Sequence, residues 1–127
     1  MIIGEAAQHS GVSAKMIRYY EDIGLITKSQ RSKSGYRNYN KADIHTLHFI
    51  KLARDVGFSI ERIRLLLAPW TDRTLTIGEL KSMAFNGIAE IDDQISKLAE
   101  LRDVLFYLTI KFPGKGRPRS PAFRNLV

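Results

Sequence analysis

The sequence predicts a mainly α-helical fold, in which four short helices and one small hairpin are followed by one long helix. Three observations lead to this prediction. Glycine and proline divide residues 1–69 into short segments of helical periodicity. A polar, basic stretch between Ile26 and Tyr39 interrupts that periodicity. From Thr74 to about Ile110 no proline occurs, and apolar residues recur at spacings of four and three.

The first two helices are predicted from their ends. The first ends at Ser10 and Gly11, where glycine suits the left-handed residue of a tight turn. Ser13 is a typical N-cap for the second, which Gly24 ends. Two short helices joined by a glycine-bearing turn form the helix-turn-helix pattern.

A small hairpin, or wing, is predicted next. Leu25 and Ile26 could start one short strand, and the alternating aromatic and polar residues of "YRNY" form a second. A basic loop that ends at Gly35 lies between them.

A third and a fourth helix complete the first domain. Gly57 ends the third, Ser59 caps the fourth, and Pro69 is expected to stop it. The predicted inward positions of the third helix are Ile44, Leu47, Leu52 and either Ile50 or Phe49. We therefore predict a domain over residues 1–69.

The long helix, over residues 70–110, carries an apolar seam. Its length is on the order of 54 Å, too long to bury the seam against a 69-residue domain. A coiled-coil partner is implied, and a second copy is the simplest supplier. A helix that breaks at Gly87 and folds back is the alternative. The seam positions are Ala84, Ile88, Ile91, Ile95, Leu98, Leu101, Leu105, Leu108 and Phe112.

Charge and composition narrow the function classes. The net charge is +7, and residues 1–69 carry eleven Lys and Arg against six Asp and Glu, which suits a polyanionic partner. With no cysteine, thiolate metal sites and cysteine nucleophiles are absent. No long apolar stretch or signal-like N-terminus is visible, so a cytoplasmic protein with no membrane contact is expected. No catalytic constellation or cofactor motif appears, and we predict neither enzyme activity nor a cofactor.

Candidate nucleic-acid contacts lie on the second helix and in the wing. Lys15, Arg18 and Tyr19 share a face, away from the apolar side of that helix. Arginine can pair with guanine edges, whereas lysine and tyrosine reach phosphates. In the wing, basic residues flank Gly35 and Tyr36.

Structural alternatives accompany these candidates. Tyr20 and Tyr39 are expected to pack in the core. The alternative for Arg18 and Arg37 is a solvated side chain or an ion pair with an acidic neighbour. Those neighbours are Glu21 and Asp22.

Three motifs resemble the MerR family of bacterial transcription regulators. "GVSAKMIRYYEDIGLI" is similar to the family's helix-turn-helix, and "RSKSGYRNYN" carries its wing pattern. "LARDVGFSIERIRLLL" resembles its second helix-loop-helix, and the long helix corresponds to its antiparallel dimerisation helix. The resemblance covers essentially the whole chain and is nearest to the copper-sensing, CueR-like branch.

The resemblance implies a winged helix-turn-helix DNA-binding domain and a long antiparallel coiled-coil dimerisation helix. It implies a homodimer on a pseudo-palindrome in double-stranded promoter DNA. The dimer bends and undertwists that DNA and so acts on RNA polymerase indirectly. The implied DNA contacts are Lys15, Arg18, Tyr19, Tyr20, Arg31, Tyr36, Arg37 and Arg54.

The resemblance stops at the metal ligands. The copper branch has two cysteines in the loop after the long helix, where this chain has Phe112 and Ser120. Neither side chain replaces a thiolate, so metal sensing by that route is not expected. His45 and His48 share a helix with only Asp43 nearby, and we predict no metal site there.

Residues 111–127 therefore form a loop or tail at the family's effector position. Its basic and aromatic content favours an anionic or aromatic effector. Alternatively, Phe112 and Phe123 pack the loop permanently, or the segment is a solvated basic tail. The candidate effector residues are Phe112, Arg117, Arg119, Ser120 and Phe123.

The leading hypothesis is a dimeric regulator that distorts promoter DNA. The alternative is a non-switching architectural or antagonist protein that occupies the same kind of site. Transcription from a promoter of this type would distinguish the two.

Overall fold

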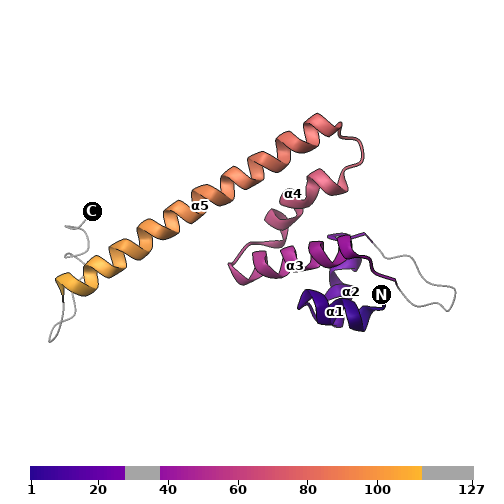
Figure 1. Ribbon diagram of the computed structural model, residues 1–127, viewed down its shortest axis with the longest axis horizontal. Coiled ribbons are helices and arrows are strands. Elements are labelled where there is room, and N and C mark those ends of the chain that lie inside the picture. The colour runs from indigo at the N-terminus through magenta and orange to yellow at the C-terminus, as the bar shows by residue number, and fades with distance from the viewer. Residues whose placement is uncertain (28–37, 113–127) are drawn as a thin grey trace. The chain divides into compact units, whose positions relative to one another are not determined.

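The computed structural model describes residues 1–27 and 38–112, and within these ranges the chain forms five helices and no strand (Figure 1). The prediction of a mainly α-helical fold is confirmed. The chain divides into two compact units, Met1–Ala84 and Phe85–Val127. The helices are α1 (Ile3–Ser10), α2 (Ala14–Asp22), α3 (Lys41–Asp55), α4 (Ile60–Thr71) and α5 (Ile77–Lys111).

Side-chain caps fix where the short helices begin. The hydroxyls of Ser13 and Ser59 accept N–H bonds at 3.2 and 3.1 Å from the residues three positions on, which confirms both predicted N-caps. At the start of α3, Asn40 and Asp43 exchange two side-chain-to-backbone bonds of 2.9 Å, a reciprocal capping box. Gly11 ends α1 at φ 79°, in the left-handed region where glycine is favoured.

The core lies among α1–α4. Helix α1 packs against α2 and α3, and α3 packs against α4. Complete burial of each large aliphatic side chain contributes about 1.5–3 kcal/mol, so this cluster stabilises the unit. Its members are Ala6, Val12, Ile17, Tyr20, Leu25, Tyr39, Leu47, Ile50, Ala53, Ile63 and Leu67.

The predicted inward face of α3 is right except at Leu52. Leu47 and Ile50 are fully buried, but Leu52 is half exposed. At 3.6 residues per turn Leu52 lies about 200° around the helix from Ile50, on the opposite side. Ala53 takes the place on the buried face that Leu52 was expected to fill.

The prediction that Pro69 stops α4 is wrong. The helix runs on to Thr71, and Pro69 is buried within it. Proline removes only its own N–H bond to the fourth preceding carbonyl. The following turn still closes, because the Asp72 N–H donates to the carbonyl of Ala68 at 2.9 Å.

The predicted first strand of the wing does not form at Leu25 and Ile26. Their N–H groups turn back to the carbonyl of Tyr20, at 2.9 and 3.4 Å, so this stretch bends instead of extending. The rest of the predicted hairpin, residues 28–37, lies outside the described residues.

Helix α5 is one unbroken helix of 35 residues, about 52 Å long (Figure 1). It passes through Gly87 without a break, so the folded-back alternative is wrong. It begins at Ile77, where Thr76 and Glu79 form a capping pair: the Thr76 hydroxyl accepts the Glu79 N–H at 3.1 Å. None of its residues is buried.

No helix in the described ranges has the length and apolar character needed to cross a membrane.

Candidate nucleic-acid interface

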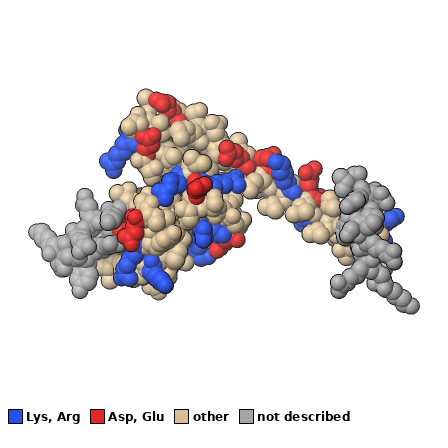
Figure 2. All heavy atoms as spheres, turned by 180° about the vertical axis from the view of Figure 1, so that it is seen from behind, with Lys and Arg blue, Asp and Glu red and all other residues tan. Residues whose placement is uncertain are grey.

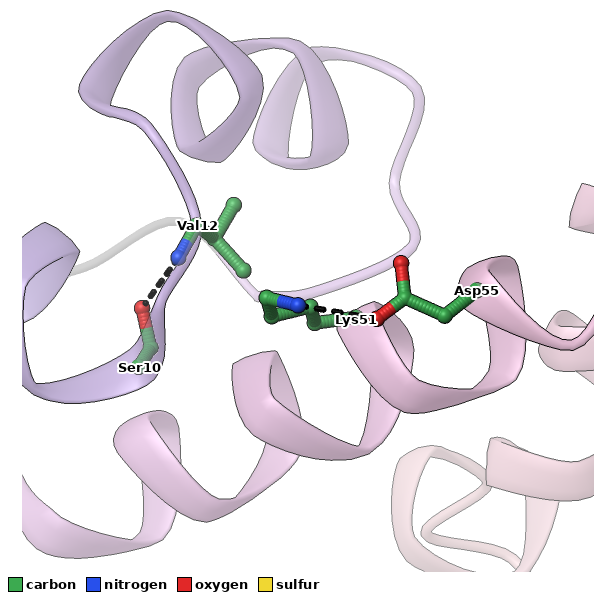
Figure 3. Close-up of polar contacts among 4 residues, drawn as sticks. All are labelled: Ser10, Val12, Lys51 and Asp55. Atoms are coloured by element: carbon green, nitrogen blue, oxygen red, sulfur yellow. Dashed lines mark hydrogen bonds and ion pairs between the residues drawn. The ribbon is translucent and has the colours of Figure 1, made fainter.

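Side-chain contacts hold the turn between α1 and α2 on its buried side and on its exposed side (Figure 3). The buried Ser10 hydroxyl accepts the Val12 N–H at 3.2 Å. Over the outside of Gly11 lies the stem of Lys51, close enough that a Cβ at Gly11 would stand 2.9 Å from its Cδ. The Lys51 ammonium pairs with Asp55 at 2.8 Å on α3. These contacts fix the angle at which α2 leaves α1.

Helix α2 has one buried side and one exposed side. Ile17 is fully buried on the core side. Lys15 and Arg18 are exposed, and Tyr19 keeps 46% of its surface accessible. Three of the four predicted contacts of this helix are therefore exposed together on one face, whereas the fourth, Tyr20, is buried.

Arg18 is free to meet an external partner. Within the described residues it forms no ion pair with Glu21 or Asp22, so the predicted alternative of an ion pair does not occur. An exposed, unpaired guanidinium on a capped helix can reach a base edge or a phosphate.

The two tyrosines expected in the core are there. Tyr39 is 2% exposed and Tyr20 is 5% exposed, which confirms the packing interpretation for both. The ring centroid of Tyr20 lies 5.8 Å from that of its exposed neighbour Tyr19. Tyr20 therefore packs in the core and contacts the exposed ring of Tyr19.

The remaining predicted DNA contacts lie outside α2. Arg54 is exposed in the last turn of α3. On α4, the guanidinium of Arg62 lies 4.1 Å from the ring centroid of Phe58, which precedes that helix. The predicted wing contacts, Arg31, Tyr36 and Arg37, lie outside the described residues.

Basic side chains lie at several places on the unit that holds these helices. Figure 2 shows its Lys and Arg side chains in separate patches, with Asp and Glu side chains between them. Helix α4 also contributes Arg64, whose guanidinium donates to the carbonyl of Ile23 at 3.0 Å, near the end of α2. A cation at this end of a helix is electrostatically favourable.

Glu21 is a buried residue near this face that the sequence analysis did not predict to be buried. The sequence suggests it only as an ion-pair partner for Arg18 or Arg37, but it is 2% exposed and accepts the Tyr39 hydroxyl. Helical periodicity could have indicated that Glu21 is buried, because it follows Ile17 by four residues and so lies on the same buried side of α2.

No metal centre is present in the described part of the chain. His45 and His48 are exposed on α3, and no group of three His, Asp or Glu side chains comes together within residues 1–27 and 38–112.

The turn between α4 and α5 holds a carboxyl group, that of Asp72, whose pKa is lowered. The Asp72 carboxylate accepts bonds from the Thr74 hydroxyl at 2.6 Å and the Thr74 N–H at 3.0 Å. These bonds lower the pKa of Asp72 below its ordinary value of 3.8, because they favour the ionised form.

Of the candidate effector residues, only Phe112 is described. It is partly buried just past the end of α5, and its N–H donates to the carbonyl of Leu108 at 3.0 Å. Arg117, Arg119, Ser120 and Phe123 lie outside the described residues.

Two family descriptions match the chain. Residues 1–69 match "MerR HTH family regulatory protein", and residues 44–106 match "MerR, DNA binding".

Individual relatives agree with these matches. The HTH-type transcriptional regulator HmrR of Sinorhizobium medicae is 46% identical over 127 residues, which is all of this chain and 86% of the relative. The regulator CueR of Salmonella typhimurium is more distant, at 34% over 126 residues, or 99% of this chain and 91% of the relative. A solved structure of HiNmlR, a MerR family regulator lacking the sensor domain and bound to promoter DNA, superposes with a TM-score of 0.64 at 25% identity. It covers 87% of this chain and 83% of its own.

Proposed function

This chain belongs to the MerR family of DNA-binding transcription regulators, and from that premise we propose that it binds a pseudo-palindromic promoter site as a homodimer. The dimer bends and undertwists the DNA and so controls transcription. The observation that carries the proposal is the exposed face of α2, where Lys15, Arg18 and Tyr19 stand together above a buried core. RNA polymerase is affected indirectly, through the shape of the promoter.

The apolar surface of α5 supports the homodimer. Ile95 and Leu98 are 59% and 60% exposed although both lie on the predicted seam. A second α5, running antiparallel, would cover this seam. A two-fold dimer carries two copies of α2, and two related half-sites in the DNA match that symmetry.

Distortion of the DNA is an energetically accessible step. Bending a site of this kind costs on the order of 1–6 kcal/mol, which contacts from two helices and two wings can supply. The wing contacts in this proposal are Arg31, Tyr36 and Arg37, with Arg54 as a phosphate contact.

Each part of the chain has a proposed role. Residues 1–69 form the winged helix-turn-helix domain, residues 70–110 the dimerisation helix, and residues 111–127 the loop at the effector position. Transcriptional control in the cytoplasm, not catalysis, is the activity that this arrangement supports.

The signal that sets the state of the dimer is not a thiolate-bound metal, since the chain has no cysteine. Three proposals remain for residues 111–127. Phe112 and Phe123 pack the loop and hold one state permanently, the basic and aromatic side chains bind an anionic or aromatic effector, or the segment is a solvated basic tail. Burial of one phenylalanine, about 1.5–3 kcal/mol, is enough to bias a two-state dimer.

Transcription in vitro tests the proposed function. The template is a promoter whose two recognition elements lie too far apart for RNA polymerase, with a site for this protein between them. We expect the protein to change the transcript yield. Binding without any change in transcription would favour the architectural or antagonist interpretation.

A gel shift with the same DNA tests the interface. Arg18→Ala and Arg37→Ala should each weaken binding by about 1–3 kcal/mol. Arg102→Ala, an exposed arginine of α5, is the matched control and should bind as the wild type does. Unchanged affinity in both interface variants would contradict the proposal.

A further inference from the structure

A buried carboxylate joins the end of α2 to the residue before the N-cap of α3. Glu21 and Tyr39 are each 2% exposed, and the Tyr39 hydroxyl donates to the Glu21 carboxylate. A carboxylate out of contact with water is costly unless it is hydrogen-bonded, so this pair is a built element of the core.

Tyr39 is also held through its backbone. Its N–H donates to the carbonyl of Met1 at 2.7 Å, and its own carbonyl accepts a bond of 2.7 Å from the Met1 nitrogen. The neighbouring Asn38 side chain accepts a second bond from the same nitrogen at 2.8 Å. The chain is therefore fixed in position and direction where it arrives at Tyr39.

The departing end of the same stretch is fixed at the same helix terminus. Leu25 is 1% exposed, and the N–H groups of Leu25 and Ile26 donate to the carbonyl of Tyr20. The described residues on both sides of this stretch, Ile26 before it and Tyr39 after it, are thus both fixed to the end of α2.

We propose that Glu21 and Tyr39 are positioning residues for DNA binding. The pair sets where residues 28–37 return relative to the exposed face of Lys15, Arg18 and Tyr19 on α2. It therefore sets whether the two sets of contacts reach one DNA duplex together. This inference rests on the proposed function, which assigns DNA contacts to Arg31, Tyr36 and Arg37.

Three variants separate the hydrogen bond from the side-chain volume. Tyr39→Phe removes the donor and Glu21→Leu removes the acceptor, whereas Glu21→Gln keeps an acceptor oxygen. The probe is a labelled duplex that the wild-type protein has enriched from a random-sequence pool. We expect Tyr39→Phe and Glu21→Leu to weaken DNA binding about tenfold or more. Glu21→Gln should retain most of the wild-type affinity.

A second set of variants tells positioning from folding. Arg31→Ala and Arg18→Ala are each measured in the wild-type and in the Tyr39→Phe background. Arg31→Ala should cost much less in the Tyr39→Phe background, because Arg31 no longer reaches the DNA there, while Arg18→Ala should cost the same in both. The slope of log affinity against log salt should also fall by about 0.9 for each phosphate that the variant no longer neutralises.

Ile63→Val is the matched control for stability. It removes one methylene from a fully buried side chain of α4 that takes no part in the hydrogen bond between Glu21 and Tyr39. It should lower the melting temperature without changing the salt slope, and titration at high DNA concentration gives the active fraction of every variant. If Tyr39→Phe fails to fold, Glu21→Leu, which removes the acceptor of the same hydrogen bond, carries the same comparison.

The inference is overturned if Arg31→Ala and Arg18→Ala cost the same factor in both backgrounds with an unchanged salt slope. The pair would then act on folding alone. Failure of the wild-type protein to enrich any duplex would instead overturn the proposed function.

Discussion

The helices α1–α4 and the helix α5 differ in how far their apolar side chains are buried. Every buried apolar side chain in the described residues lies between Ala6 and Pro69, and α5 has none. The seam residues Ile95, Leu98 and Leu101 are 56–60% exposed. The first region buries an apolar core of its own, whereas α5 presents an apolar surface that no other described residue buries.

Contacts within α5 do not replace that partner. The ion pair between Lys97 and Asp93, at 2.9 Å, is solvent-exposed, and pairs of this kind contribute about 0.3–0.5 kcal/mol. Helical continuity therefore comes from backbone bonds and caps, while the seam stays uncovered. This contrast leads to predictions in which a substitution affects the function of one region and leaves that of the other unchanged.

The largest effect is expected in the core of the first region. Leu47→Ala removes a fully buried side chain and should lower the free energy of unfolding by about 2–5 kcal/mol, measured by urea denaturation. Leu52→Ala is the matched control: the same substitution on the same helix, at a position that is 51% exposed, should cost well under 1 kcal/mol. Equal decreases would contradict the assigned face of α3.

The next effect is expected on the seam of α5. Leu98→Glu places a charge where we propose that a second copy packs, and it should raise the dimer dissociation constant about a hundredfold or more. Ser96→Glu adds the same charge off the seam and should leave dimerisation unchanged. Sedimentation equilibrium measures both. A Leu98→Glu variant that dimerises like the wild type would remove α5 as the interface.

A smaller effect is expected for a phosphate contact of α2. Lys15→Ala should lower the salt slope of DNA binding by about 0.9 if this lysine neutralises one phosphate. Lys97→Ala, which removes an exposed lysine of α5, should leave the slope unchanged. A matching decrease in both variants would mean that the DNA interface is not confined to the first region.

The smallest effect is expected in the turn between the two regions. Thr74→Val removes the hydroxyl bond to Asp72, so the pKa of this carboxyl should rise toward 3.8, as followed by NMR titration. Because the folded-state pKa is depressed, the stabilisation is present above the unfolded value and is lost as pH falls through the folded value. Stability near neutral pH should barely change, and an unshifted pKa in the variant would contradict the assigned bonds.

Much of the fold could be predicted because its signals are local. Ser13, Ser59 and Gly11 determine helix ends through their own side chains or backbone, and each lies where the sequence predicts it. The seam of α5 was likewise visible as a repeat.

The errors concern positions where packing or the following turn decides. Pro69 continues its helix because the next turn closes without its N–H. Helix α5 begins at Ile77, not near Thr74, because the Thr76–Glu79 pair caps it there. These outcomes depend on bonds to later residues, which single-residue preferences do not contain.

The candidate site likewise has a part that the sequence predicts and a part that it does not. Lys15, Arg18 and Tyr19 were predicted from helical spacing, and the structure places them together on an exposed face. The buried link between Glu21 and Tyr39 was not predicted, since it joins residues 18 positions apart. Helical period could suggest that Glu21 is buried but not what it meets.

Sedimentation equilibrium of the full chain, alone and with its enriched duplex, tests the central claim most directly. The contrast between a self-sufficient DNA-binding region and an uncovered α5 predicts a mass of two chains at micromolar concentration, and two chains on each duplex. A single-chain mass under these conditions, or one chain on each duplex, would contradict it.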